Sequence, residues 1–225
     1  GPLLREEIPQ GCNLDEASGW FVCGPETDDR GATVQRSYGF LDASGAAQSA
    51  YDEATTASIG LRFVLDARPE RDGHTGVVHI EHDLAVRGLA GNEATRTWSG
   101  TLSEHFEGVP PHGPGGPGGP PGPGGPGGPG GGAPPEPPDD GFDPSQTVVT
   151  TTTTIEDVVL PHPLGPETWP ISGAIHRTET IVAGPHGDEE RASVLTFNGT
   201  RYVPLTAGGE TTTIDLLRPP RPPRP

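Results

Sequence analysis

Apolar and polar residues alternate over most of this chain, and the spacing of an amphipathic helix is nearly absent. Alternation with a period of two is typical of strands that bury one face. In the first half of the chain it predicts strands at residues 33–41, 46–51, 59–67, 78–86 and 95–102. Residues 42–45, with the sequence Asp-Ala-Ser-Gly, have the composition of a four-residue hairpin turn. A short helix at residues 46–55 is an alternative for the second strand.

Two of these predicted strands show the alternation most clearly. One face of the strand at 59–67 carries only apolar residues, Ile59, Leu61, Phe63 and Leu65. One face of the next strand carries Val78, Ile80, Leu84 and Val86, and His82 interrupts it. We expect both faces to point toward the core.

The second half of the chain continues the same pattern. It predicts strands at residues 147–159, 171–182, 192–197, 200–206 and 211–216. Asn198-Gly199 is the strongest local hairpin signal in the chain and predicts a two-residue type I′ turn. The last third therefore reads as a meander. Exposed threonines also line up on single faces, at Thr150, Thr152 and Thr154 and at Thr211 and Thr213. Such arrays occur in ice-binding proteins, but threonine is also an ordinary strand residue.

These elements predict an all-β fold, an antiparallel sandwich or distorted barrel of about ten strands with an inserted polyproline-type segment. The boundaries follow changes in composition. We expect an N-terminal segment at 1–31, a first β half at 32–108, a Gly/Pro-rich rod at 109–141, a second β half at 142–217, and an Arg/Pro tail at 218–225.

The rod has glycine at every third residue from Gly113 to Gly131. Three residues per turn is the period of a polyproline II helix, so each column of residues forms one edge. One edge is Gly113, Gly116, Gly119, Gly122, Gly125 and Gly128, and another is Pro114, Pro117, Pro120, Pro123, Pro126 and Pro129. A flexible linker is one interpretation. The run also resembles collagen-like and polyglycine II segments, and this resemblance implies packing against other copies or against the protein's own body.

The C-terminal tail repeats the three-residue period with arginine, at Arg218, Arg221 and Arg224. In a polyproline helix these side chains form one basic edge, with about 9 Å between successive stems. The rest of the chain is acidic, so the tail is a candidate docking strand for the body or for a neighbouring subunit. A disordered tail or a PxxP ligand is the alternative.

The formal net charge is −17, with fourteen arginines and no lysine. Phosphate binding needs a basic surface, so nucleic acid is a poor partner for this chain. Solubility explains the excess of carboxylates, and calcium is the functional alternative. Asp139, Asp140 and Asp143 surround a glycine in one loop and are a weak calcium candidate, although the full EF-hand pattern is absent. We expect no other cofactor or metal.

Cys12 and Cys23 are the only cysteines, and their spacing fits neither a zinc site nor covalent haem. We predict a disulfide between them, which contributes about 3 kcal/mol in the chain-entropy model. Two unrelated thiols are the alternative. No stretch of sequence is hydrophobic enough to span a membrane. We therefore expect an extracellular or cell-surface protein.

Few residues point to catalysis. His79, Glu81 and His82 form a group resembling a metal motif, but on a strand His82 points away from the other two. The nucleophile-elbow, P-loop and Rossmann patterns are absent. Asn198-Gly199-Thr200 matches a glycosylation acceptor, which a hairpin turn also explains.

The stretch from 169 to 205, with WPISGAIHRTET and FNGTRYVPL, resembles uncharacterised secreted β-rich proteins of GC-rich bacteria. This resemblance brings no known activity. The sequence favours a non-enzymatic subunit of a self-assembling filament, sheath or surface layer, that is, a homo-oligomer or polymer. A monomeric binding module or adhesin with a Gly/Pro stalk is the alternative, and a secreted hydrolase is a minor one.

Overall fold

The protein is all-β in a computed structural model that describes residues 12–71, 74–91, 93–108, 146–165, 167–184 and 187–217. Within them the strands are β1 (Cys12–Asp15), β2 (Trp20–Thr27), β3 (Thr33–Asp42), β4 (Ala47–Gln48), β5 (Thr56–Ala67), β6 (Glu70–Arg71), β7 (His74–Thr75), β8 (Val77–Arg87), β9 (Thr95–Glu107), β10 (Val148–Pro161), β11 (Ser172–Gly184), β12 (Gly187–Thr196), β13 (Tyr202–Ala207) and β14 (Glu210–Asp215). The predicted all-β, antiparallel class is confirmed.

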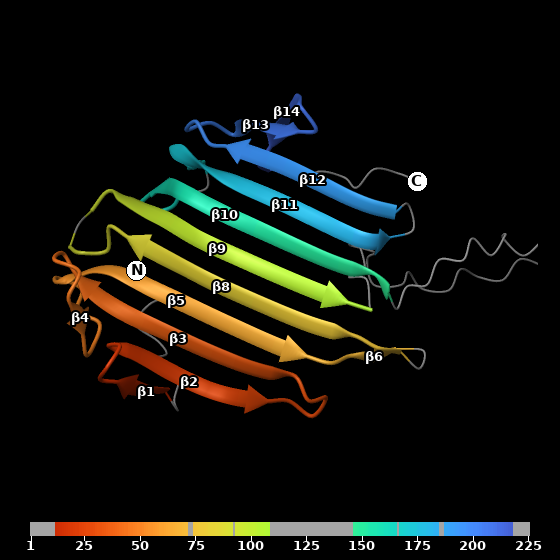
Figure 1. The fold of residues 1–225 in the computed structure, drawn as a ribbon. Coiled ribbons are helices and arrows are strands. Elements are labelled where there is room, and N and C mark those ends of the chain that lie inside the picture. The colour runs from red at the N-terminus through yellow and green to blue at the C-terminus, as the bar shows by residue number, and fades with distance from the viewer. Residues whose placement is uncertain are drawn as a thin grey trace, which may run out of the picture.

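Twelve of the strands form one open antiparallel sheet. Its order is β1-β2-β3-β5-β8-β9-β10-β11-β12-β13-β14, with the short β4 paired to β3, and β6 and β7 make a separate small hairpin. The order follows the chain, so almost every strand pairs with its sequence neighbour, and β1 and β14 lie at opposite edges (Figure 1). The residues 109–145, which hold the predicted rod, connect β9 to β10 and lie outside the described part of the chain.

Strand register gathers apolar side chains on one side of this sheet. For example, Phe40 of β3 pairs with Ile59 of β5, and Ile59 pairs with Val86 of β8. We call this side the apolar face; its apolar and aromatic members on β2 to β10 include Phe21, Tyr38, Phe40, Ile59, Leu61, Phe63, Leu65, Ile80, Leu84, Val86, Trp98, Leu102, Phe106, Val149, Ile155 and Val158. The same register places His82, Arg36, Glu104, Thr151 and Thr153 on this side. The opposite side is the polar face. The alternation predicted for residues 59–67 and 78–86 is therefore confirmed.

A register shift in β10 keeps the apolar face continuous. Ile155 pairs with Gly100 of β9, and Val158 pairs with Trp98. Ile155 and Val158 are three positions apart and would point to opposite faces of a regular strand, but the extra residue between them brings both to the apolar face. Asp157 within the shift has a φ of 42°.

The two clusters of buried apolar residues lie at one end of the sheet, while Val149 and Thr151 of β10 are buried further along the same face. One cluster joins Phe40, Ile59, Val86 and the loop residue Leu89, and a second joins Val158, Phe197 and Val203. Trp98 packs against both clusters. At this end, the loops after β4, β8 and β12 contribute side chains that cover the apolar face.

Some predicted local elements are corrected by the structure. The hairpin turn at 42–45 is present, but β4 has only two residues, and residues 53–55 form a turn rather than a helix. The prediction of a type I′ turn at Asn198-Gly199 is wrong. Such a turn needs a positive φ at both central residues, and of the two only Gly199 has one, of 77°. Asn198 Oδ1 instead accepts a hydrogen bond from Thr200 Oγ1 at 2.8 Å, and Gly199 N donates to Pro170 O at 2.9 Å. These bonds hold a five-residue loop between β12 and β13.

Candidate assembly surfaces

The middle of the apolar face is a single layer. All substantial contacts between described strands are between hydrogen-bonded neighbours, so no second sheet packs on this side. Leu61 remains 38% exposed, and only nine apolar side chains are buried among the described residues. A soluble protein rarely leaves such a continuous apolar surface uncovered, and large ones mark interaction sites.

Two polar atoms on the apolar face lack partners within the described chain. Tyr38 Oη and His82 Nε2 are both buried without a hydrogen bond. The Tyr38 ring stacks on Phe21 with centroids 5.0 Å apart, and the His82 ring lies 5.4 Å from that of Phe63. Burial raises the pKa of Tyr38 above its ordinary value, because the charged phenolate loses water. Leaving a buried polar atom without a hydrogen bond lowers the stability of the fold by about 1–3 kcal/mol. Tyr38 Oη and His82 Nε2 are therefore unfavourable features of the single chain.

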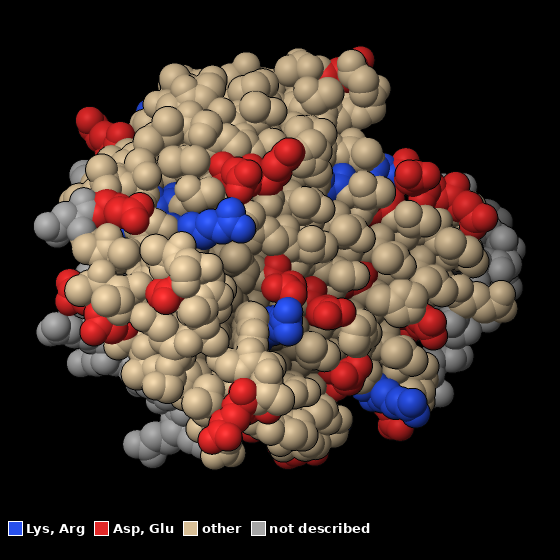
Figure 2. Space-filling view, turned by 60° about the vertical axis from the view of Figure 1, so that its left-hand side comes forward, with Lys and Arg blue, Asp and Glu red and all other residues tan. Residues whose placement is uncertain are grey.

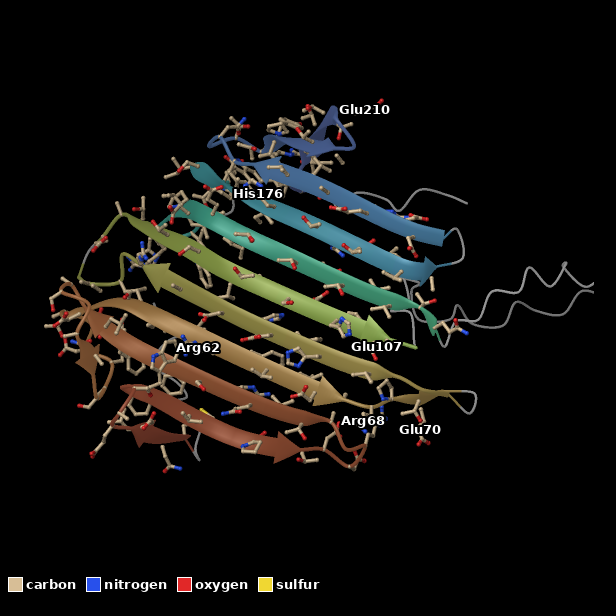
Figure 3. The ribbon with its side chains drawn as sticks, viewed as in Figure 1. Arg62, Arg68, Glu70, Glu107, His176 and Glu210 are labelled. Carbon is tan, nitrogen blue, oxygen red and sulfur yellow. A yellow bond between two sulfur atoms is a disulfide. The ribbon has the colours of Figure 1, made fainter. Side chains whose placement is uncertain are left out.

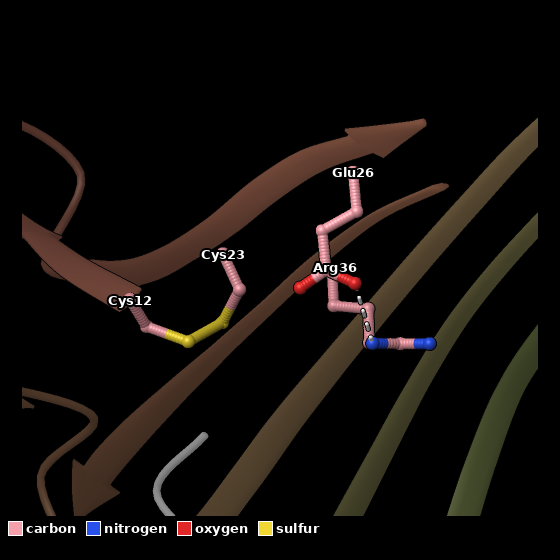
Figure 4. Close-up of a disulfide and its surroundings, with 4 residues drawn as sticks. All are labelled: Cys12, Cys23, Glu26 and Arg36. Atoms are coloured by element: carbon pink, nitrogen blue, oxygen red, sulfur yellow. Dashed lines mark ion pairs between the residues drawn. A yellow bond between two sulfur atoms is a disulfide. The ribbon is translucent and has the colours of Figure 1, made fainter. Parts of the chain in front are cut away.

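Ion pairs border the apolar face on two sides. Near β2, Arg36 lies 3.8 Å from Glu26 (Figure 4). On β11 and β12, Glu179 contacts both Arg177 and Arg191, at 3.2 Å and 3.6 Å. Register places these residues on the same side of the sheet as Phe63 and Leu102. The apolar area thus ends in charges that neutralise one another.

Several charged side chains of the polar face also pair within the chain. Arg62 Nε lies 3.1 Å from Asp83 Oδ2, and the Arg62 guanidinium lies 4.3 Å from the Trp20 ring. His79 contacts Asp66 at 2.8 Å. Cross-strand register continues from Arg62 and Asp83 through two threonines to His176, a row that can be followed between the labelled residues in Figure 3.

Trp20 lies flat over two glycines on the polar face. A Cβ atom at Gly60 would be 2.5 Å from Trp20 Cη2, and one at Gly39 would be 3.2 Å from Trp20 Cδ2. Bare glycines are therefore required for the indole to lie on the sheet, with Arg62 on the indole. Both sides of the ring are thus occupied, and it offers no free platform to a ligand.

The free edges of the sheet form a second kind of surface. At one edge, β1 has four residues, and beyond it β2 continues with Pro25, which lacks an N–H group. At the other, β14 presents Glu210–Asp215 with three consecutive threonines. Six residues of β12, 187–192, also extend past the part that pairs with β13, and four of them are charged. Charged edge residues discourage strand addition, so β14 is the more permissive edge.

The predicted disulfide is present: Cys12 and Cys23 are direct cross-strand partners on β1 and β2 and are joined through their sulfur atoms (Figure 4). His79 and His82 lie on opposite faces, as expected, and do not meet at one ion. Among the residues that the structure describes, no group of His, Cys, Asp or Glu is arranged to hold a metal ion.

The other predicted site residues lie outside the described residues. These are the glycines and prolines of the rod, Arg218, Arg221 and Arg224 of the tail, and Asp139, Asp140 and Asp143 of the calcium candidate. Sequence reasoning did not single out Tyr38, Leu61 or His82 as surface features. Their strands alternate as core strands do, and alternation alone does not tell whether a second layer covers them.

Charged side chains are dispersed over the end of the molecule drawn in Figure 2, where acidic and basic groups intermingle among uncharged ones. Within the described ranges, no helix is both long and apolar enough to cross a membrane. The chain matches no family model, no curated protein and no solved structure. The surfaces of the sheet are therefore the basis for inferring its function.

Proposed function

We propose that this protein is a non-enzymatic structural subunit of a self-assembling extracellular filament, sheath or surface layer. The observation that carries the proposal is the single-layer apolar face, which no other described strand covers. A sheet with one apolar face must bury that face to be stable in water. Contact with other copies of the chain is a direct way to do so.

The two kinds of surface have different consequences for assembly. A contact in which the same face of two copies meets is closed and makes a dimer. A contact between the β1 edge of one copy and the β14 edge of the next uses two different surfaces, and such head-to-tail contacts can extend without limit. Together they are sufficient for a filament or a layer.

The size of the full-length protein in solution tests this proposal. We expect sedimentation and negative-stain microscopy to find polymers or higher oligomers. Lysines at Thr211 and Thr213 of β14 should stop growth at small oligomers, because charges at an edge oppose strand addition. The same substitutions at Thr178 and Thr180, inside the sheet on β11, are the matched control. Discrete monomers at every concentration would contradict the proposal and favour the monomeric binding module.

A further inference from the structure

The apolar face offers an extended surface to a second copy. Five neighbouring strands, β3, β5, β8, β9 and β10, each have ten or more residues. With strands about 4.8 Å apart and a rise of about 3.3 Å per residue, they span roughly 800 Å² in all, and the part over the two core clusters is already covered. Each partner in a standard-size protein interface buries roughly 800 Å², so the uncovered part corresponds to an interface at the lower end of the size range.

The chemistry of this face matches the anatomy of an interface. Its middle is mostly apolar and rich in aromatic rings, with Glu104 as a single carboxylate on β9, and its two sides end in the ion pairs of Arg36 and Glu179. An apolar centre with a polar rim is the usual arrangement of a protein contact. Because these rim charges are paired within one chain, they leave no unbalanced charge to select a polyanion or a polycation.

We propose that two copies pack their apolar faces together as a two-fold symmetric, two-layer sandwich, and that this dimer is the building block of the assembly. The inference rests on the proposed self-assembly and specifies its first contact. Twisted sheets pack face to face about 10 Å apart with interdigitating side chains. The same surface on both copies makes the contact isologous.

Two substitutions on one strand test the contact. Leu61 lies on the apolar face of β5, and Val64 lies on its polar face beside Glu81. We expect Leu61→Arg to raise the dimer dissociation constant by at least roughly a hundredfold, because the contact would bury two unpaired charges. Val64→Arg should leave it within about twofold. Far-UV circular dichroism of both variants establishes that they fold.

A cysteine at the same two positions gives an independent measurement that keeps the face uncharged. In Leu61→Cys we expect the alkylation rate of the new thiol to fall at least tenfold as the protein concentration rises, while the thiol of Val64→Cys reacts rapidly throughout. Slow alkylation at position 61 that does not depend on concentration would overturn the proposal, because the chain itself would then cover the face. Rapid alkylation that slows only with detergent micelles would overturn it in favour of a lipid partner.

The two proposals fail in different ways. If wild-type protein polymerises and Leu61→Arg polymerises equally well, the face-to-face contact is wrong while self-assembly stands, and the edges become the contact. If wild-type protein is monomeric at every concentration, self-assembly and the face-to-face contact are both wrong.

Discussion

Along β8, side chains that point to opposite faces of the sheet meet very different surroundings. Asp83 points to the polar face and pairs with Arg62, and His79 on the same side bonds to Asp66. Between them, His82 points to the apolar face, where its Nε2 atom has no hydrogen bond within the described chain. On one side of this strand Asp83 and His79 are therefore paired, and on the other the polar His82 lies unbonded among apolar side chains.

The two faces therefore differ in how far contacts within a single chain satisfy their side chains. On the polar face, Arg62 pairs with Asp83 and lies over the Trp20 ring, and these contacts are made within one copy. The apolar face is covered most fully at one end of the sheet, where Phe40 and Val203 are buried, and Val149 and Thr151 are buried further along β10. Exposed ion pairs contribute only about 0–1 kcal/mol each. The stability of a single copy must therefore depend on its two small core clusters.

The largest expected effect comes from truncating the core at the closed end of the apolar face. Phe40 is buried and contacts the rings of Phe21, Tyr38 and Tyr51. We expect Phe40→Ala to lower the free energy of unfolding by about 3–5 kcal/mol, because the lost contacts leave a cavity. Urea denaturation measures this change.

Phe63→Ala is the matched variant in the open middle of the same face. Its ring is only half-buried, so we expect a loss of about 1 kcal/mol in dilute protein. The loss should grow with protein concentration if a second copy covers this ring. Equal effects of Phe40→Ala and Phe63→Ala in dilute protein would contradict the distinction between the closed end and the open middle.

A second prediction concerns the edge of the sheet next to the apolar face. Replacing Cys12 and Cys23 with serine opens the loop between β1 and β2. We expect the free energy of unfolding to fall by about 3 kcal/mol, the chain-entropy value for a loop of this length. Urea denaturation of the double variant and of reduced wild-type protein should agree. An unchanged midpoint would indicate that β1 unfolds separately from the rest of the sheet.

The sequence predicted the strands well where one face is strictly apolar. Residues 59–67 and 78–86 lie within β5 and β8, and their apolar sides were correctly assigned. β9 runs five residues further than predicted, to Glu107. Its last residues are mostly polar, and they extend the strand because cross-strand partners on β8 and β10 are present. Long-range pairing of this kind is not visible in a local pattern.

Other features depended on interactions that alternation cannot encode. The shift between Ile155 and Val158 inserts one residue, and the runs of threonine and valine in β10 carry no alternation that would reveal it. Asn198-Gly199 failed as a type I′ turn because Gly199 bonds to Pro170 from another loop. The sequence also could not predict that no second strand layer would cover the apolar face. Whether a strand's apolar side meets a second layer is decided by the topology of the whole sheet.

On the polar face, the Trp20 platform gives a third prediction of intermediate size. A methyl group at Gly60 would clash with the indole at 2.5 Å, whereas at Gly39 the closest indole atom is 3.2 Å away. We expect Gly60→Ala to lower the free energy of unfolding by about 1–3 kcal/mol, because overpacking displaces the ring. Gly39→Ala, which needs only a small adjustment, should cost less. Denaturation curves and tryptophan emission report the two effects, and the reverse ranking would contradict the geometry.

The smallest effect concerns the satisfied polar groups of the turns. Asp42 Oδ1 accepts hydrogen bonds from Ser44 Oγ at 2.6 Å, from Ser44 N at 2.8 Å and from Ala46 N at 3.0 Å. The Ser44 hydroxyl and then these amides hold the pKa of Asp42 below its ordinary value of 3.8. A folded-state pKa that is depressed stabilises the fold above the ordinary value, and that stabilisation is lost as the pH falls through the folded-state pKa.

We therefore expect Asp42→Asn to lower the thermal midpoint slightly at neutral pH and to match wild-type protein in strong acid, where both side chains are uncharged. Ser44→Ala removes one of the three donors and should show the same pH dependence with a smaller amplitude. Melting curves of the three proteins across this pH range make the comparison. A difference between Asp42→Asn and wild-type protein that stays constant into strong acid would mean that the carboxylate charge contributes nothing to the turn. Because Asp42 caps a single exposed turn, the assembly should be unaffected by either variant, in contrast to Leu61→Arg.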